Sequence, residues 1–377
     1  MFTGRKLPAG IQDFDMNFQN TSRQRMLDAF NYNHPDKIPL VFHPSPAGLY
    51  VHGQKLLDLF NKYSSDNPVL FDKIPVLGPD AFDAHGDYHQ IITDEWGSDI
   101  AYRIFGIAGH VKKYPFGSWK EALSNYKFPS VEASASRVFS LDANKKDVEN
   151  KRYLIFNGWI SIFEKVTAIH PFDDTLMELL IRDKDLLCFL DRLVDYWLEA
   201  IDYYHRIGTD VYVFGDDWGM QCSTMVDPGM FREIFKPRYA KLFERVKSYG
   251  GLPFLHCCGF MGEIFDEFVD LGIRGLWHQM NLYEEDKYLE QKCKEHKIAV
   301  FIHADRQNLM PLGTPAQITA YIKRKAEKYK EMGGGGIFYV EIENDAPFEN
   351  VLALFEAIDQ YRDRNAYSGK KSYICGC

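Results

Sequence analysis

The feature that most constrains the fold is a regular alternation of short apolar runs with longer amphipathic segments. A short apolar run bounded by turn residues is typical of a buried strand, and apolar residues spaced three and four apart are typical of a helix. The apolar runs lie at residues 37–44, 152–161, 210–219, 252–259, 274–280, 299–306 and 337–343. The helical segments lie at residues 52–65, 186–208, 228–251, 262–272, 286–297, 314–336 and 347–364.

Strands that alternate with helices of this length form parallel βαβ units. Seven strands are clear, and an eighth is expected in the long irregular stretch after the first strand, at residues 71–77. About eight such units favour a closed (β/α)8 barrel, and a doubly wound open sheet is the alternative. We therefore predict an α/β protein with a single TIM-barrel domain over residues 1–377, an excursion at about 66–150 and a short C-terminal tail.

Polar side chains gather where the predicted strands end, and the carboxyl ends of barrel strands surround the active site. In the stretch LPFLHCCG, His256 and Cys258 share one face of an extended strand while Cys257 points away. An imidazole and a thiolate on one face make half of a zinc site. The alternative is an inert buried thiol beside a core histidine. Because Asp, His and Glu side chains end the other strands too, the concentration at one end of the barrel indicates chemistry.

Composition restricts the possible partners. The net charge is -9, so the chain lacks the basic surface on which binding to nucleic acid depends. The N-terminal residues contain no apolar segment of signal-peptide length, and no run reaches the roughly 18 apolar residues of a membrane span. The 7 cysteines are scattered without paired spacing, which is typical of a reducing compartment. We therefore expect a cytoplasmic protein that binds neither nucleic acid nor membrane.

Several segments resemble the uroporphyrinogen decarboxylase-like superfamily, and they occur in the same order. They are DEWGS, FEKVTAI, FGDDWGMQ, PGMFREIFKPRYAKLF, FLHCCG, DLGIRGLWHQM, LMPLGTP and PFENVLALFEAI. The resemblance covers nearly the whole chain from about residue 23 onward. It implies a (β/α)8 barrel in one of two branches: tetrapyrrole decarboxylases, or zinc-dependent methyltransferases that work with methylated corrinoid proteins.

The residues after the first strand favour the methyltransferase branch. The decarboxylases have an arginine-rich segment there, since a substrate with many carboxylates requires fixed guanidinium donors. This chain has HPSPAGLY instead, with no arginine between His43 and Tyr50. Each charged hydrogen bond that is not made would cost about 1.5 to 3 kcal/mol. We therefore expect no decarboxylation of uroporphyrinogen, and a carboxy-lyase of that type remains an alternative only.

The methyltransferase branch carries a His-x-Cys pair at this strand end, which His256 and Cys258 match. Members that resemble coenzyme M methyltransferases take a further cysteine ligand from the last strand. The corresponding stretch here, YVEIENDAPFENV, has no cysteine, but Glu341 and Glu343 lie on one strand face. Because a carboxylate can bind zinc, we predict a site of His256, Cys258 and either Glu343 or Glu341, with an open fourth position.

Two chemistries are consistent with such a site. Zinc could bind a thiol acceptor as the thiolate, which then attacks the methyl group of methylcobalamin. Alternatively, the oxygen of a methoxy compound is polarised and cob(I)alamin takes the methyl group. A carboxylate in place of a thiolate leaves a harder metal ion, which favours the methoxy compound. Aromatic rings in DEWG, NGWISIF and GDDWG could line a pocket for a methoxylated ring, although core packing explains most aromatic residues.

The remaining candidates are residues at or near strand ends. The predicted catalytic residues are Asp217, Glu164 and Asp305, and the predicted substrate contacts are His278, His303, Tyr50 and Trp218. Helix capping is the alternative role for Asp217 and for Glu164. The tail carries Cys375 and Cys377, for which metal binding, a redox role and no role all remain open.

The predicted partners are a corrinoid protein, which would carry methylcobalamin or cob(I)alamin, and a small methyl donor or acceptor. The oligomeric state is not determined by the sequence, and a homodimer is compatible with it. A barrel that binds a small molecule or a corrinoid without catalysis is the alternative to an enzyme.

Overall fold

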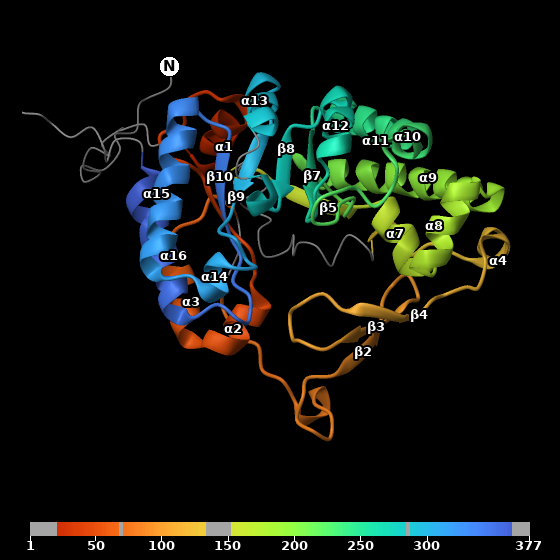
Figure 1. The fold of residues 1–377 in the computed structure, drawn as a ribbon, viewed down its shortest axis with the longest axis horizontal. Coiled ribbons are helices and arrows are strands. Elements are labelled where there is room, and N and C mark those ends of the chain that lie inside the picture. The colour runs from red at the N-terminus through yellow and green to blue at the C-terminus, as the bar shows by residue number, and fades with distance from the viewer. Residues whose placement is uncertain (1–20, 68–70, 133–151, 284–286, 364–377) are drawn as a thin grey trace, which may run out of the picture.

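The computed structural model describes residues 21–67, 71–132, 152–283 and 287–363, and it has a TIM-barrel-like α/β fold (Figure 1). Seven parallel strands curl into part of a barrel, with helices packed outside them. These strands are β1 (Leu40–Phe42), β5 (Phe156–Ile160), β6 (Val211–Gly215), β7 (Leu252–Cys257), β8 (Gly275–His278), β9 (Ala299–Ile302) and β10 (Gly336–Val340). All seven strands predicted from the apolar runs are therefore present.

The helices follow the amphipathic segments. They are α1 (Ser22–Asn31), α2 (Pro46–His52), α3 (Gln54–Lys62), α4 (Trp119–Asn125), α7 (Phe163–Ile169), α8 (Phe172–Ile181), α9 (Lys184–Arg206), α10 (Pro228–Met230), α11 (Lys236–Ser248), α12 (Phe265–Leu271), α13 (Lys287–Glu295), α14 (Leu309–Leu312), α15 (Pro315–Met332) and α16 (Phe348–Arg362). Residues at its two ends determine where α15 begins and ends. Thr314 and Gln317 form a capping box at its start, and Gly333, with φ 82°, follows its last turn. In the described residues, no helix is both long and apolar enough to cross a membrane.

The strand order is β1-β10-β9-β8-β7-β6-β5, and every neighbouring pair is parallel. The order is that of a TIM barrel, but in the described residues no strand joins β1 to β5. The eighth strand expected at residues 71–77 is absent, because that segment forms no strand or helix. Pro75 lies in this segment and has no N–H to donate to a ladder, which disfavours a central strand there.

Alternate residues of each strand face two different cores. The inner core lies inside the curled sheet and includes Val41, Phe254 and Tyr339. The outer core lies between the sheet and the helices and includes Leu255 and other residues of opposite parity. Helix α1 contributes to the inner core as well, so it covers the amino ends of the strands. The carboxyl ends are left as the mouth of the barrel.

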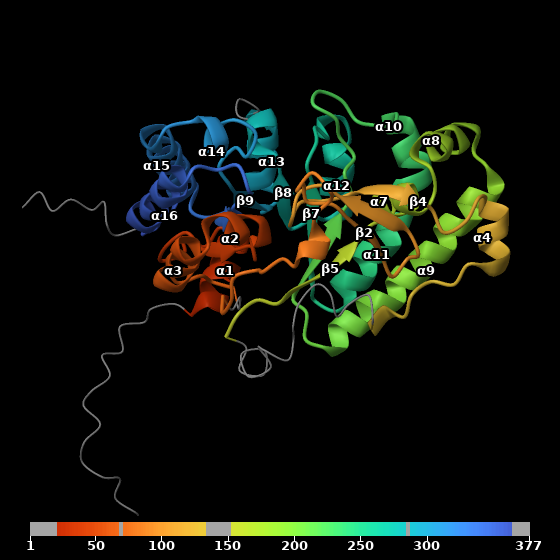
Figure 2. The ribbon, with the colours of Figure 1, turned by 90° about the horizontal axis from the view of Figure 1, so that it is seen from below.

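The excursion lies across this mouth. It contains the antiparallel strands β2 (Gln90–Thr93), β3 (Asp99–Tyr102) and β4 (His110–Lys113). In Figure 2, the small sheet lies in front of the barrel strands, between α2 on one side and α9 on the other. Phe105 contacts Tyr50 of α2, with ring centroids 5.4 Å apart, and Trp96 contacts Trp197 of α9, with centroids 5.7 Å apart. The excursion is therefore anchored on both sides of the mouth.

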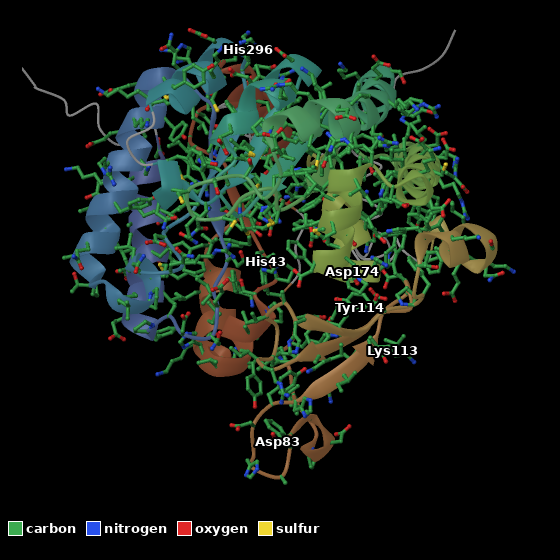
Figure 3. The ribbon with its side chains drawn as sticks, turned by 45° about the vertical axis from the view of Figure 1, so that its right-hand side comes forward. His43, Asp83, Lys113, Tyr114, Asp174 and His296 are labelled. Carbon is green, nitrogen blue, oxygen red and sulfur yellow. The ribbon has the colours of Figure 1, made fainter. Side chains whose placement is uncertain are left out.

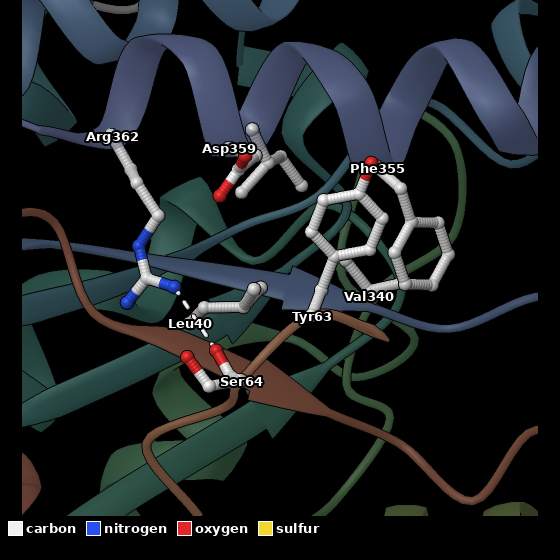
Figure 4. Close-up of a pocket in the computed structure, with 8 residues that line it drawn as sticks. Leu40, Tyr63, Ser64, Val340, Phe355, Asp359 and Arg362 are labelled. Carbon is white, nitrogen blue, oxygen red and sulfur yellow. Dashed lines mark hydrogen bonds between the residues drawn. The ribbon is translucent and has the colours of Figure 1, made fainter. Parts of the chain in front are cut away.

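A buried ion network joins the first strand to the last helix. The Asp66 carboxylate pairs with Arg25 and with Arg362, whose Nη2 atom lies 2.6 Å away. It also accepts a hydrogen bond from the Leu40 backbone N–H at 2.9 Å. Arg362 donates to the Ser64 carbonyl at 3.2 Å, beside a small cavity (Figure 4). All three charged side chains are less than 10% exposed, so their pairing is essential to the fold.

Candidate functional site

Three possible metal-binding side chains meet at the carboxyl ends of β6 and β7. They are Asp217, His256 and Cys258, whose donor atoms all lie within 4.8 Å of one another. The His256 Nε2 atom is 3.2 Å from the Cys258 Sγ atom and 3.8 Å from Asp217 Oδ1. We refer to these three residues as the donor cluster.

Strand parity and register bring the cluster together. Leu255 and Cys257 of β7 belong to the outer core, so His256 and Cys258 point to the inside of the barrel. On β6, Gly215 lies beside His256 in the ladder, and Asp217 follows two residues later on the same side. The Asp217 carboxylate accepts a hydrogen bond from the Cys258 N–H at 2.7 Å, which ties the two strand ends together.

The neighbouring Asp216 has a different role. Its carboxylate accepts hydrogen bonds from the backbone N–H groups of Ile162 and Glu164, each at 2.7 Å, and from the Tyr239 hydroxyl. It is 0% exposed and anchors the start of α7. Asp216 therefore points away from the donor cluster, to which Asp217 belongs.

Burial sets the protonation of the donor cluster. Desolvation lowers the pKa of His256 to about 3, so its imidazole is neutral at neutral pH and Nε2 can offer a lone pair. Burial raises the pKa of Cys258 to about 11, an effect that Asp217 increases and Arg306 opposes. The pKa of Asp217 is also raised, chiefly by burial. A divalent cation would offset these desolvation costs, because it stabilises the thiolate and the carboxylate together.

Two tryptophan side chains flank His256. The ring centroid of Trp277 is 4.1 Å from that of His256, and the centroid of Trp159 is 5.1 Å from it. Trp159 can lie this close because its neighbour on β6 is Gly215, where an added Cβ would be 2.2 Å from Trp159 Cε2. Tyr339 of β10 packs on Trp277 at 4.6 Å. These rings, which we call the aromatic wall (Trp159, Trp277 and Tyr339), are apolar surface beside the donor cluster.

An ion network lies on the other side of Cys258. Arg306, which follows β9, donates from Nη1 to Glu341 and to Glu343, each at 3.0 Å, and its Nη2 atom is 3.8 Å from Cys258 Sγ. His43 after β1 lies 3.4 Å from Glu341. Figure 3 shows His43 at the end of the barrel toward the excursion, and His296 at the opposite end of the molecule. The mouth is therefore lined from β1, β5, β6, β7, β8, β10 and the loop after β9.

The predicted glutamate ligands do not join the donor cluster in this structure. Both Glu341 and Glu343 point inward as strand parity predicts, but their carboxylates bind Arg306. Asp217 takes the third place instead. Arg306 is not among the candidates that the sequence indicates, although it ends the predicted strand at residues 299–306, where polar side chains gather.

The other two predicted catalytic residues differ in their surroundings. Glu164 lies in the first turn of α7, and its Oε2 atom is 3.4 Å from the indole nitrogen of Trp159. Burial, reinforced by Asp216 and Asp217, raises the pKa of Glu164 to about 8. Asp305 instead accepts hydrogen bonds from the Gln307 N–H at 2.8 Å and from Asn308 at 3.1 Å. Asp305 therefore stabilises a turn, and these contacts do not direct it to the donor cluster.

Two predicted substrate contacts point away from the donor cluster. His278 has the parity of Leu276, so it points to the outer layer, where it lines a small cavity with Cys293 and Lys325. Trp218 is 0% exposed and packs against Phe163 and Phe235 in the outer core. Neither side chain belongs to the donor cluster in this structure, because neighbouring residues of an extended segment point to opposite sides; contact with a substrate stays a prediction for both.

The other two predicted substrate contacts, His303 and Tyr50, have surroundings unlike those of His278 and Trp218. His303 is 4% exposed, and its Nε2 atom lies 2.8 Å from the His278 carbonyl. Its Nδ1 atom is 3.1 Å from the Ala304 carbonyl, so each ring nitrogen faces a backbone carbonyl and the neutral ring donates to one of the two. Tyr50 is 40% exposed on α2 at the contact with the excursion. The cysteines of the tail, Cys375 and Cys377, lie outside the described residues.

The donor cluster has the chemistry of a zinc site. Zinc is bound in proteins by imidazole nitrogen, thiolate sulfur and carboxylate oxygen, and catalytic sites use three protein ligands and keep one position open. One atom of each kind is available from His256, Cys258 and Asp217. His256 Nδ1 is buried without a hydrogen-bond partner, so the contact of the ring is through Nε2. The residues present therefore fit zinc.

Two solved structures are similar to this chain, and the first of them supports the fold. A methyltransferase from Methanosarcina mazei superposes with a TM-score of 0.59 over 90% of this chain and 99% of that chain, at 16% sequence identity. A 3-keto-D-glucoside 4-epimerase from E. coli matches 59% of this chain and 84% of that chain, with 9% identity and a TM-score of 0.37. No curated protein sequence matches.

The sequence profile of one family, described as uroporphyrinogen decarboxylase (URO-D), matches residues 166–361. The match is more than half of the chain and includes every residue of the donor cluster, Arg306 with its two glutamate partners, and the strands from β6 to β10. Together with the barrel-like fold, this match shows that the chain belongs to the uroporphyrinogen decarboxylase (URO-D) family.

Proposed function

We propose that this protein is a zinc-dependent methyltransferase that moves a methyl group from a small methoxylated compound to the corrinoid of a partner protein. The single observation that carries the proposal is the donor cluster, in which Asp217, His256 and Cys258 meet at the mouth of the barrel. The fold similarity to a methyltransferase from Methanosarcina mazei supports it. Zinc, when bound, would act as a Lewis acid toward an oxygen or sulfur atom of the substrate.

The side chains around the cluster have separate roles in this proposal. His256, Cys258 and Asp217 hold the metal ion, and the aromatic wall orients the substrate and excludes water from one side. Glu164 is protonated at neutral pH, because its pKa is raised to about 8. In the transfer, the bond between oxygen and the methyl carbon breaks, its electron pair stays on the oxygen, and the methyl group passes to the reduced corrinoid. Glu164 supplies the proton that the leaving oxygen takes up.

Transfer in the opposite sense, from a methylated corrinoid to a thiol, is the second candidate. The feature that favours it is Cys258, because a metal ion that a protein thiolate binds also binds a substrate thiolate. The carboxylate of Asp217 favours an oxygen ligand instead, since it leaves a harder metal ion than a second thiolate would. We therefore rank the methoxy compound first.

Decarboxylation of a tetrapyrrole has less support. A substrate with many carboxylates requires several guanidinium donors. Arg306 lies at the mouth, but two glutamates already bind it. The segment after β1 supplies none, since residues 44–49 contain no arginine.

Two measurements test the proposal. The purified protein should contain close to one zinc per chain, and chelation should abolish methyl transfer. A panel of methoxylated aromatic compounds, methylamines and thiols, assayed with reduced and with methylated cobalamin, identifies the donor and the acceptor. Formation of methylcobalamin from a methoxy compound is expected. If the protein binds zinc but transfers no methyl group with any of these compounds, the alternative of a non-catalytic binding protein replaces the proposal.

A further inference from the structure

We infer that Glu341 and Glu343 are specificity-determining residues: by occupying Arg306, they make the mouth select an uncharged methoxylated aromatic substrate and reject the carboxylated counterpart. The inference rests on the proposed function and names the substrate class of the same site. Neither glutamate is needed as a metal ligand, because Asp217 completes the donor cluster. What both glutamates bind in this structure is Arg306.

The positive charge of Arg306 at the mouth is already engaged by acidic side chains. Arg306 is the guanidinium beside the donor cluster, and its Nη1 atom lies 3.0 Å from Glu341 and 3.0 Å from Glu343. Its Nη2 atom faces Cys258 Sγ at 3.8 Å. One positive charge is thus opposed by two carboxylates, which leaves this network at -1. A substrate carboxylate would therefore meet a guanidinium whose charge is already more than offset, in a network that repels anions.

A second positive side chain near the mouth, that of Lys165, also lies among acidic groups. Lys165 lies on α7, and its Nζ atom is 4.2 Å from the centre of the Trp96 ring in the excursion. The carboxylates of Asp94 and Glu95 act on this ammonium group, while the neighbouring Glu164 is protonated at neutral pH. Lys165 is therefore balanced as well. His43 adds no charge at neutral pH, since burial lowers its pKa.

The aromatic wall is the surface that remains for the substrate. The aromatic wall lies directly against His256, with Trp277 at 4.1 Å and Trp159 at 5.1 Å between ring centroids. Both tryptophans are partly exposed, whereas Tyr339 is only 6% exposed. A flat aromatic ring can stack on such a surface without any charged group. Contact area and ring stacking, rather than ion pairing, then supply the affinity.

The experiment measures binding alone, by calorimetry on the full-length protein, with no corrinoid present. The three probes share one ring and one methoxy group: 4-methoxybenzamide is neutral, 4-methoxybenzoate is an anion and 4-methoxybenzylamine is a cation. The amide should bind at least tenfold more tightly than the benzoate. Equal or tighter binding of the benzoate overturns the inference, and so does binding of the amine tenfold tighter than the amide. If none of the three binds, the aromatic substrate class is wrong.

Variants test whether the glutamates cause the selection. The double change Glu341→Gln with Glu343→Gln frees Arg306 and should strengthen benzoate binding at least tenfold while amide binding changes less than threefold. Adding Arg306→Met to that background should remove the gain. Glu356→Gln, an exposed carboxylate on α16, is the matched control and should leave all three affinities unchanged. A double variant that folds, as circular dichroism would show, but gains no affinity for benzoate refutes the role of the glutamates.

The two proposals fail in different ways. Absence of methyl transfer while the order of binding affinities holds counts against the proposed function alone. Methyl transfer from 4-methoxybenzoate at the rate of the amide, with equal affinities, counts against the selection alone. The wild-type probe series stands even if the double variant does not fold.

Discussion

Replacing Cys258 by alanine removes the sulfur atom from a cluster of three donors whose atoms lie within 4.8 Å of one another. Structural zinc sites in peptides bind with about 10 to 16 kcal/mol over four ligands, so one ligand contributes roughly 3 to 4 kcal/mol. At about 1.4 kcal/mol for each factor of ten, the Kd for zinc should rise roughly 100- to 1000-fold. His256 and Asp217 alone would then hold zinc weakly, and methyl transfer should be lost with it.

The neighbouring cysteine is the matched control. Cys257 is 0% exposed in the outer core, and its Sγ atom lies 3.5 Å from the Gly259 carbonyl. Cys257→Ala should therefore cost about 1 kcal/mol of stability and leave zinc binding unchanged. The assay is the zinc content after dialysis, together with the thiolate-to-cobalt absorption of the cobalt-substituted protein. If Cys257→Ala lost the metal and Cys258→Ala kept it, the assignment of strand faces that underlies the donor cluster would be refuted.

Three further changes test other parts of the structure. Asp66→Asn should lower the free energy of unfolding by about 3 to 5 kcal/mol, because it leaves buried guanidinium groups without their shared carboxylate; a loss below about 1 kcal/mol in urea denaturation would contradict this. Gly215→Ala should displace the Trp159 indole, since the new Cβ would lie 2.2 Å from Trp159 Cε2; an unchanged tryptophan fluorescence spectrum would argue against the close contact. The pKa of Glu164 is raised from 4.5 to about 8, so between these values the folded protein binds more protons than the unfolded chain, and stability should fall as pH rises from about 5 to 8. Glu164→Gln should lack this component, and a pH profile identical to the wild type would count against the raised pKa.

Strand parity accounts for most of what could be predicted correctly about the site. The alternation of faces is a local property of an extended chain, so the stretch LPFLHCCG alone predicts that His256 and Cys258 point together and that Cys257 points away. The same rule explains why two other candidates lie outside the donor cluster. On β8, Trp277 faces the mouth. His278 faces the outer core, because it has the same parity as the buried Leu276. Trp218, the residue after Asp217, likewise points into the outer core and is 0% exposed.

The sequence by itself determined the seven strands, the helices between them and the end of the barrel at which the polar residues gather, because hydrophobic period and turn residues are local. Only the tertiary structure decided which side chains meet across the mouth. Arg306 lies far from Glu341 in the chain, and nothing local predicts that the two glutamates bind it while Asp217 approaches His256. The absence of a strand at residues 71–77 agrees with Pro75 in that segment, whereas the anchoring of the excursion on α2 and α9 was decided by packing between distant segments. Such contacts depend on the curvature of the sheet and on competition among charged groups for partners, and neither is a property of any short stretch of sequence.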